Sequence, residues 1–137
     1  MDLSLKGKTA LVCGSSQGIG LATAIELALL GATCILLARN EDSLKAVLPT
    51  LSTANGQQHS YEIADFSEVA QVKAVAAKLA AQGPIHVLIN NTGGPAGGPI
   101  IEAAVEAFTA AFSQHVACNQ LLVQALVPGM IKAGYGR

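Results

Sequence analysis

Three glycines in one short segment, Gly14, Gly18 and Gly20, are the residues of this sequence best suited to hold a phosphate group. Glycine lets the backbone turn tightly and lets an anion approach the N–H groups without a Cβ in the way. The residues between these glycines are Ser15, Ser16, Gln17 and Ile19. The Gly-x3-Gly-x-Gly spacing predicts a wider first turn than the common Gly-x-Gly-x2-Gly loop, with Ser15 and Ser16 near an adenosine ribose. A tight strand-to-helix turn that binds nothing is the alternative interpretation.

A basic residue follows the second apolar run, about twenty residues beyond the glycine loop. In nicotinamide-dinucleotide sites this position commonly holds a carboxylate, which binds the ribose 2′-hydroxyl and repels a 2′-phosphate. Here the sequence has Arg39 and Asn40. A guanidinium attracts a phosphate dianion through paired charge-assisted hydrogen bonds, so the pattern favours NADP over NAD. The alternative is that Arg39 is a solvated loop cation.

An acidic residue directly follows the third expected strand. At that position the Asp65 carboxylate is placed to accept a hydrogen bond from an adenine amino group, and the backbone of Phe66 to help fix the ring. The alternative is that Asp65 is an ordinary turn or cap residue before Ser67, because aspartate is common at such positions. The spacing alone does not separate these two interpretations.

Short apolar runs alternate with helical patterns along the whole chain. The expected strands are 9–13, 33–38, 60–64 and 87–90. The most apolar of these runs indicate strands that are covered on both faces, and the stretches between the runs repeat apolar residues every three or four positions, as helices do. Strands that alternate with helices form parallel sheets with right-handed crossovers. We therefore expect one α/β domain over residues 1–137, a Rossmann-type doubly wound parallel sheet with strand order 3-2-1-4.

Local signals set the expected ends of the helices. Asn40 is a suitable N-cap for the second helix, which Pro49 should bend or shorten, and Ser67 is a suitable N-cap for the third. A glycine- and proline-rich segment before the last, long helix is expected to be irregular. His59 and His86 lie at strand edges, where we expect them to be solvated.

Composition and charge exclude several classes of function. Hydrophobic residues make up 51% of the chain, charged residues 12%, and the net charge is −1. This gives no electrostatic case for nucleic acid or for an anionic membrane surface as a partner. No stretch has the roughly 18 apolar residues of a membrane-spanning helix, and residues 1–8 lack the apolar region of a signal peptide. Cys13, Cys34 and Cys118 lie in apolar segments without metal-ligand spacing, so we expect reduced core thiols, no metal and a cytoplasmic protein.

Together, these motifs resemble those of the classical short-chain dehydrogenase/reductase family. The matching parts are the glycine loop, Asp65 and the segment Asn90-Asn91-Thr92-Gly93. The opening of the first strand, at residues 6–12, is most similar to that of 3-oxoacyl-(acyl-carrier-protein) reductases. The resemblance covers nearly the whole chain, and it implies the Rossmann-type fold that the strand and helix patterns predict.

The resemblance also implies a place for each part of the cofactor. The pyrophosphate would lie on the amides around Gly18, and the adenine beside Asp65 and Phe66. The residues along the ribose would be Asn91, Thr92 and Gly93. Asn90 would tie the fourth strand to its neighbours.

The sequence departs from the family pattern at several positions. Cys13 stands where the family usually has Thr, and Thr92 where it usually has Ala, which indicates a divergent subgroup. In the long helix, His115 stands at the position of a catalytic Asn that holds a proton-relay water in the family. Asn119 lies one turn further on the same face and is a partial substitute. Capping of a neighbouring backbone group is as good an interpretation of His115 as a proton relay.

The carbonyl chemistry of the family needs three further residues. A Tyr whose pKa is lowered by a nearby Lys protonates the developing alkoxide, and a Ser orients the substrate. Neither Tyr61 nor Tyr135 is followed by a Lys four residues later. The resemblance therefore implies the cofactor-binding half of a reductase of about 250 residues, inactive by itself and without the fifth and later strands.

As a whole, the resemblance implies an NADP-dependent oxidoreductase that reduces a ketone or a 3-oxoacyl group. Its partners would be a small-molecule carbonyl or acyl substrate and further copies of itself, in a dimer or tetramer when full length. The alternative is a non-catalytic nucleotide-binding or regulatory module that keeps the fold and lacks the chemistry.

Overall fold

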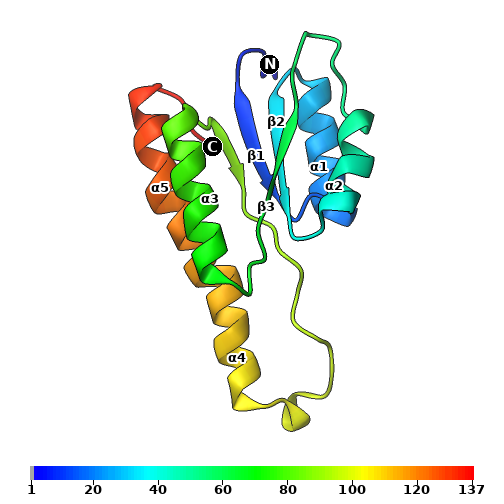
Figure 1. Cartoon of the computed structure of the whole chain (residues 1–137), viewed down its shortest axis with the longest axis vertical. Helices are drawn as coiled ribbons and strands as arrows, with labels where there is room; N and C mark the ends of the chain where they lie inside the picture. The colour runs from blue at the N-terminus through cyan, green and yellow to red at the C-terminus, as the bar shows by residue number, and fades with distance from the viewer. Residues whose placement is uncertain (1) are drawn as a thin grey trace.

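Residues 2–137 are described by a computed structural model, in which a parallel four-stranded sheet lies between two layers of helices (Figure 1). The strands are β1 (Thr9–Cys13), β2 (Thr33–Ala38), β3 (Ser60–Ile63) and β4 (Val87–Ile89). The strand order is β3-β2-β1-β4, and each neighbouring pair is parallel. This is the doubly wound topology that the sequence predicts, with β1 and β2 inside and β3 and β4 at the edges.

Helices cover both faces of the sheet. On one face lie α1 (Gly18–Leu29) and α2 (Glu41–Val47), and on the other α3 (Val69–Gln82) packs against α5 (Cys118–Lys132) (Figure 1). The shorter elements are the 3-10 turns Leu48–Thr50 and Ile100–Glu102, the helix α4 (Val105–Phe112) and the π-helical turn Ser113–Ala117. The chain therefore crosses to one face of the sheet after β1 and to the other after β4.

Two apolar clusters hold the sheet between its helices. Successive residues of β1 point to opposite faces, so that Leu11 packs with residues of α3 and α5 while Val12 packs with residues of α1 and α2. Both side chains are fully buried. β1 and β2 carry no charged residue because neither strand has a face in contact with water. The burial on both faces fixes the carboxyl ends of the strands relative to one another.

The limits of α2 agree with the local signals. Asn40 caps the helix, since its Oδ1 accepts a hydrogen bond from the backbone N–H of Ser43 at 2.8 Å. The helix ends at Val47, and Pro49 lies in the 3-10 turn that follows. The proline thus shortens the helix, because its ring and missing N–H do not fit a helix interior.

The expected cap of α3 at Ser67 is wrong. The helix begins at Val69, and no side chain among the described residues caps it. The Ser67 hydroxyl instead donates to Asp65 Oδ1 at 2.7 Å. A hydrogen bond to a carboxylate is stronger than one between neutral groups, so the hydroxyl is held in the turn before the helix.

The expectation that His59 and His86 are solvated is also wrong. The Nδ1 atom of His59 accepts a hydrogen bond from the backbone N–H of Cys34, and that of His86 from the backbone N–H of Thr9, each at 3.0 Å. Both rings are half-buried. These two imidazoles satisfy backbone donors near the starts of β1 and β2 that no strand neighbour reaches.

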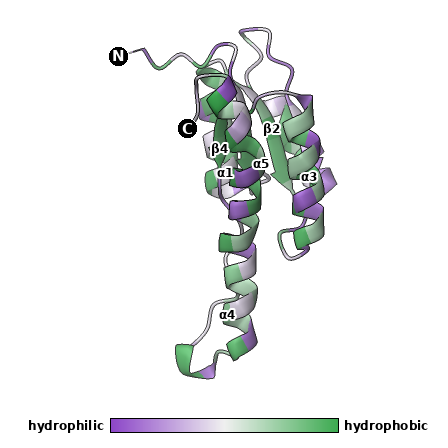
Figure 2. Cartoon of the chain, turned by 90° about the vertical axis from the view of Figure 1, so that its left-hand side faces the viewer, coloured by the Kyte–Doolittle hydropathy of each residue, from purple (hydrophilic) through white to green (hydrophobic). Residues whose placement is uncertain are grey.

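The long helix runs through α4 and α5 but contains one wider turn, Ser113–Ala117, whose backbone bonds are of the π type. On the α5 side, Leu122 and Leu126 are buried against α3 and the sheet. On the α4 side, Phe108 and Phe112 are exposed, and α4 extends beyond the sheet as an apolar arm (Figures 1 and 2). Only the α5 half of the predicted helix therefore belongs to the core.

Removal of a buried side chain from α5 should destabilise the fold. We expect Leu122→Ala to lower the free energy of unfolding by about 2–5 kcal/mol, because Leu122 is fully buried and its loss leaves a cavity. Ile131→Ala is the matched control, since Ile131 is 74% exposed on the same helix. Urea unfolding followed by circular dichroism measures both variants. Equal losses of stability would contradict the packing of α5 described here.

Candidate functional site

A cleft of about 420 Å³ lies at the carboxyl ends of the strands. Of the residues expected at a binding site, it is lined by Gly14, Ser16, Gln17, Gly18, Ile19, Arg39, Asp65, Phe66, Asn91, Thr92 and Gly93. β1 and β4 are neighbours at this edge, and their crossovers lead to opposite faces of the sheet. Open α/β sheets bind ligands at such a switch point, so the position of the cleft agrees with a ligand site.

Backbone crowding explains two of the three loop glycines. Gly14 has a φ of 60°, and a Cβ there would lie 2.6 Å from Asn91 Nδ2. A Cβ on Gly20 would collide with the Gly14 carbonyl oxygen. Gly18 has a φ of 58°, but no described atom lies within 4 Å of its Cβ position. Gly14 and Gly20 thus allow close packing, whereas Gly18 allows the turn and leaves open space on the side of the cleft.

The N-terminus of α1 supplies hydrogen-bond donors to the cleft. The helix begins at Gly18, and no side chain among residues 2–137 caps it. The first N–H groups of a helix have no partner within the helix, and the helix dipole is positive at this end. Gln17, Gly18 and Ile19 line the cleft there, while Gly20 is buried behind them. This arrangement fits the pyrophosphate of a dinucleotide.

The two serines of the loop have different environments. Ser15 is fully buried, and its hydroxyl oxygen accepts a hydrogen bond from the backbone N–H of Leu37 at 3.1 Å. The expectation that the Ser15 side chain lies beside a ribose is therefore wrong, because the hydroxyl satisfies a buried donor of β2. Ser16 is half-buried and lines the cleft, where its hydroxyl is available to a ligand.

Arg39 is exposed at the rim of the cleft, directly after β2. Among the described residues its guanidinium forms neither an ion pair nor a hydrogen bond; the ion pairs found there involve Lys45 and Lys78. Asn40 lies outside the cleft lining, and its side chain is engaged in the cap of α2. Of the two residues that follow β2, only Arg39 is therefore placed to meet an anion in the cleft.

Asp65 and Phe66 line the cleft after β3. Asp65 Oδ1 accepts hydrogen bonds from the Ser67 hydroxyl at 2.7 Å and the Ser67 backbone N–H at 2.8 Å. These two bonds, and more weakly the charge of Arg39, hold the pKa of the Asp65 carboxyl below its usual value. The structure thus joins the two interpretations of Asp65: one oxygen stabilises the turn, and the residue also faces the cleft.

Asn91, and not Asn90, ties the loop after β4 to its neighbours. Asn91 Nδ2 lies 3.3 Å from the carbonyl oxygens of Cys13 and Gly14, to which it donates. Asn90 is exposed, so the expectation that its side chain ties β4 to its neighbours is wrong. β4 ends at Ile89, and the residue that contacts the end of β1 is Asn91. The side chain of Asn91 is therefore committed to the backbone, although the residue lines the cleft.

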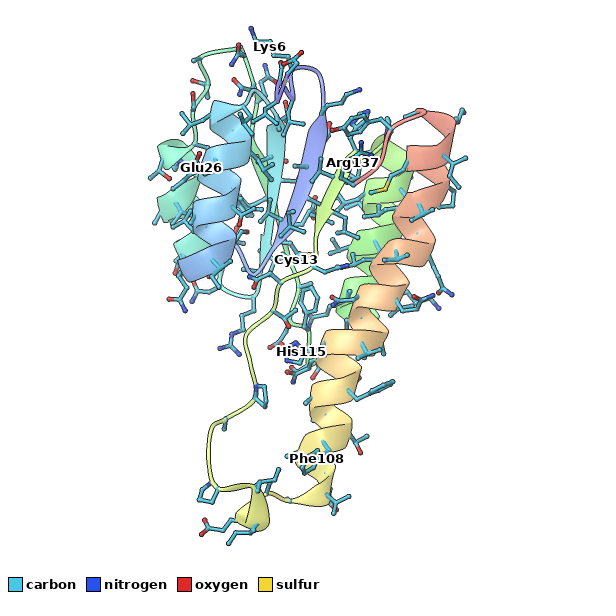
Figure 3. The ribbon with its side chains drawn as sticks, turned by 180° about the vertical axis from the view of Figure 1, so that it is seen from behind. Lys6, Cys13, Glu26, Phe108, His115 and Arg137 are labelled. Atoms are coloured by element: carbon cyan, nitrogen blue, oxygen red, sulfur yellow. The ribbon has the colours of Figure 1, made fainter. Side chains whose placement is uncertain are left out.

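His115 lies on the π-helical turn and faces the loop after β4 (Figure 3). Its Nδ1 atom is 2.6 Å from Thr92 Oγ1. Within residues 2–137, His115 Nε2 and Asn119 Oδ1 are buried and have no hydrogen-bond partner. The hydrogen bond of His115 is thus to a side chain, not to the backbone group that the capping interpretation expects. Thr92 lines the cleft, whereas neither His115 nor Asn119 is among its lining residues.

Several residues of the cleft lining were not expected from the sequence. Gln114 reaches it from the long helix, and the others are Ala38, Ala64, Ser67 and Gly94. The last residues of β2 and the residue after β3 could have been inferred, since ligands of such sheets contact the carboxyl ends of strands. Gln114 carries no such signal, because the π turn changes which residues of the helix face the cleft.

The cysteines show no features of a reactive or metal-binding site. Cys13, Cys34 and Cys118 are free thiols and are buried. Burial raises the pKa of Cys13 to about 12 and that of Cys34 to about 11, so both stay protonated at neutral pH. Between residues 2 and 137, no three His, Cys, Asp or Glu side chains are grouped as metal ligands, and no helix has both the length and the hydropathy of a membrane span.

Comparison with known proteins identifies the family. The family model described as short chain dehydrogenase matches residues 8–137. The chain belongs to this family. This short-chain dehydrogenase is 31% identical to L-xylulose reductase of Mesocricetus auratus, over 98% of the chain and 52% of that relative. It spans about half the length of the curated relatives it matches.

Solved structures of related enzymes share the fold. L-sorbose reductase from Gluconobacter frateurii, complexed with NADPH and L-sorbose, is 34% identical and superposes with a TM-score of 0.89. The 3-oxoacyl (acyl-carrier-protein) reductase from Agrobacterium tumefaciens C58, with NADP bound, is 27% identical and also has a TM-score of 0.89. Each match covers 99% of this chain and 52% of the other chain. These relatives confirm the predicted Rossmann-type fold.

The two loop serines of this short-chain dehydrogenase should respond differently to the same substitution. We expect Ser15→Ala to lower the free energy of unfolding by about 1–3 kcal/mol, because it leaves the buried N–H of Leu37 without a partner. Ser16→Ala, the matched control, should change it by less than about 0.5 kcal/mol, as its side chain is not needed by the fold. Denaturant unfolding of both variants is the measurement. A larger loss for Ser16→Ala than for Ser15→Ala would contradict this assignment.

Proposed function

We propose that this short-chain dehydrogenase binds NADP(H) in the cleft and belongs to an enzyme that reduces a ketone or a 3-oxoacyl group. The observation that carries the proposal is the free guanidinium of Arg39 at the rim of the cleft. It lies on the same cleft as the open glycine loop and the uncapped N-terminus of α1. A dinucleotide with an additional phosphate requires an anion site for its pyrophosphate and a cation at the end of β2 for its 2′-phosphate.

The proposed preference for NADP over NAD is supported by Arg39. A carboxylate after β2 would select the 2′-hydroxyl of NAD, whereas a guanidinium forms paired charge-assisted hydrogen bonds with the 2′-phosphate of NADP. Ser16 lines the cleft and supplies a further donor. The related sorbose and 3-oxoacyl reductases were solved with NADPH and NADP. These observations favour NADP over NAD for this chain.

The other parts of the cofactor find matching groups along the cleft. We place the pyrophosphate at the amides of Gly18 and Ile19, and the adenine beside Asp65 and Phe66. Asp65 is charged at neutral pH, since its pKa is lowered, and no donor among residues 2–137 bonds to its Oδ2. That oxygen is free to accept from an adenine amino group. The ribose would then run along the backbone of the segment 91–93.

Reduction of a carbonyl needs a hydride and a proton. The cofactor, when bound as NADPH, would supply the hydride to the carbonyl carbon. His115, which contacts Thr92 of the cleft wall, and Asn119, four residues further along the helix, are the candidates for the proton relay. Neither Tyr61 nor Tyr135 lines the cleft. We therefore propose that these 137 residues hold the cofactor and that the proton donor to the substrate is not among them.

A nucleotide-binding or regulatory module without catalysis is the second candidate. It is favoured by the positions of the two tyrosines: the hydroxyl of Tyr61 donates to Glu41 Oε1 at 2.8 Å, and the ring of Tyr135 lies under the ammonium of Lys8. Both are occupied away from the cleft. This candidate shares the cofactor site with the first and differs from it in having no carbonyl substrate.

We further propose a cytoplasmic enzyme that assembles into a dimer or tetramer. The support for assembly is the apolar arm of α4, which extends away from the sheet (Figure 2). On this arm Phe108 and Phe112 are 55% and 61% exposed. Exposed apolar patches of this kind mark surfaces that contact other proteins. The substrate is proposed to be a small-molecule carbonyl or acyl compound, as the names of the related sorbose and xylulose reductases indicate for those enzymes.

Titration with cofactor tests the proposed function. We expect the chain to bind NADPH, detected by the change in nicotinamide fluorescence, and to bind NADH more weakly. Addition of L-sorbose or a 3-oxoacyl thioester to the complex should leave the NADPH absorbance constant over hours, because neither Tyr61 nor Tyr135 is among the residues that line the cleft. No binding at millimolar NADPH would overturn both candidates. Oxidation of NADPH by the chain alone would contradict the proposal that the proton donor to the substrate is not among these residues.

Reversal of the charge at Arg39 should reverse the cofactor preference. We expect Arg39→Asp to weaken NADPH binding by about 10- to 100-fold, because the charge-assisted hydrogen bonds to the 2′-phosphate are lost. NADH binding should be unchanged or tighter. Lys132→Asp makes the same charge change at the far end of α5 and serves as the control. Calorimetric titration of both variants with both cofactors gives the ratios. An equal effect of the two substitutions would mean that Arg39 is only a surface charge.

A further inference from the structure

Buried polar atoms lie between the loop after β4 and the long helix. Thr92 Oγ1 and His115 Nδ1 are 2.6 Å apart. In the part of the chain that the structure describes, His115 Nε2 and Asn119 Oδ1 are both shielded from solvent and lack a hydrogen-bond partner. A buried polar atom without a partner costs stability, so such atoms are rare unless a site requires them. The three side chains therefore call for a common explanation.

Two of these side chains lie on the same side of the long helix. His115 and Asn119 are four residues apart on one helix, so their side chains project on the same face. His115 also lies within the π-helical turn Ser113–Ala117. Turns of this kind are rare and are frequently found at functional sites. The local backbone is thus arranged to aim the imidazole at the loop after β4, as Figure 3 shows for His115.

The two neutral tautomers of His115 are not equivalent in this environment. With the proton on Nε2, Nδ1 accepts from the Thr92 hydroxyl, and the Nε2–H is a donor on the helix face that carries Asn119 Oδ1. With the proton on Nδ1, the Nε2 lone pair and Asn119 Oδ1 would be two buried acceptors without a donor. The first tautomer pairs the Thr92 hydroxyl with Nδ1. It leaves two complementary groups, a donor at Nε2 and an acceptor at Asn119 Oδ1, without a partner among residues 2–137.

We infer that Thr92 is a positioning residue, whose hydroxyl donates to His115 Nδ1 and holds the imidazole as the tautomer protonated at Nε2. This hydrogen bond joins the two positions at which the resemblance implies a departure from the family pattern. An alanine at position 92 would leave Nδ1 without its donor. The threonine and the histidine therefore form a matched pair in this chain.

The same hydrogen bond determines what Thr92 offers to the cleft. Its only hydroxyl proton is directed to His115, so its oxygen presents lone pairs to the cleft that Thr92 lines. Thr92 then acts as an acceptor, and the group of a bound dinucleotide that meets it must be a donor, such as a ribose hydroxyl. This second part rests on the proposed function.

The tautomer is measured directly on the chain with ¹⁵N-labelled histidine. Long-range ¹H–¹⁵N spectra, recorded at a pH where the imidazoles are neutral, distinguish protonation at Nε2 from protonation at Nδ1. His59 and His86 are internal references, because the Nδ1 of each accepts from a backbone N–H and the proton must be on Nε2. We expect His115, assigned by its loss in His115→Asn, to match them. A His115 protonated at Nδ1 would overturn the inference.

Two substitutions at Thr92 separate positioning from simple packing. Thr92→Val keeps the shape and removes the hydroxyl, so the His115 signals should move toward a mixture of tautomers while those of His59 and His86 stay unchanged. The Kd for NADPH should rise about tenfold, the effect of losing one hydrogen bond. Thr92→Ser restores the donor and should recover both the signals and the affinity.

The outcomes distinguish this inference from the proposed function. Unchanged His115 signals in Thr92→Val would overturn the inference, and an unchanged Kd for NADPH in that variant would overturn the acceptor role of Thr92. Either result leaves the proposed NADP site in place. Failure of the unsubstituted chain to bind NADPH would overturn the proposed function, and the tautomer of His115 would still decide whether Thr92 positions it.

Discussion

Close backbone contact between the loops after β1 and β4 is the constraint on which the rest of the site depends. The Cβ positions of Gly14 and Gly20 fall on atoms of Asn91 and of Gly14 itself, so a larger residue at either position would push the loops apart. Asn91 closes the contact by donating to the carbonyl oxygens at the end of β1. Because these segments touch, the first turn of α1 begins beside the loop after β4, and the cleft opens where Gly18 leaves space.

The polar groups around this contact have two distinct tasks. The side chains of Ser15 and Asn91 bind backbone groups and so hold the strand ends together. Ser16, Arg39 and the second oxygen of Asp65 make no hydrogen bond to other described residues and face the cleft. A site must keep some donors and acceptors unpaired for its ligand, and it can do so only where other polar groups already satisfy the buried backbone. The two tasks fall to neighbouring residues of the same short loops.

The long helix connects the cofactor cleft with the surface of the molecule. Its α5 half is held by burial of Leu122 and Leu126, and its α4 half extends into solvent with an apolar face. The π-helical turn between the halves changes the phase of the helix, which brings Gln114 to the cleft and His115 to Thr92. A change in the position of the α4 arm would therefore change the geometry of the His115–Thr92 hydrogen bond, since the arm and His115 both depend on the π-helical turn.

The sequence alone predicted the sheet order and a ligand site at the glycine loop, because glycine spacing and apolar periodicity are local consequences of backbone geometry. It left alternatives open for Arg39 and Asp65, and the structure places both on the wall of the cleft. The sequence could not determine which of two adjacent residues binds the backbone and which faces the cleft. The structure gives the backbone tie to Asn91 instead of Asn90 and buries Ser15 while Ser16 faces the cleft, and it pairs His59 and His86 with strand N–H groups. The partners in these bonds lie 22 to 78 residues apart in the chain, as for Ser15 with Leu37 and Asn91 with Cys13. Only the closed sheet brings them within hydrogen-bond distance, so their identity is a property of the tertiary structure.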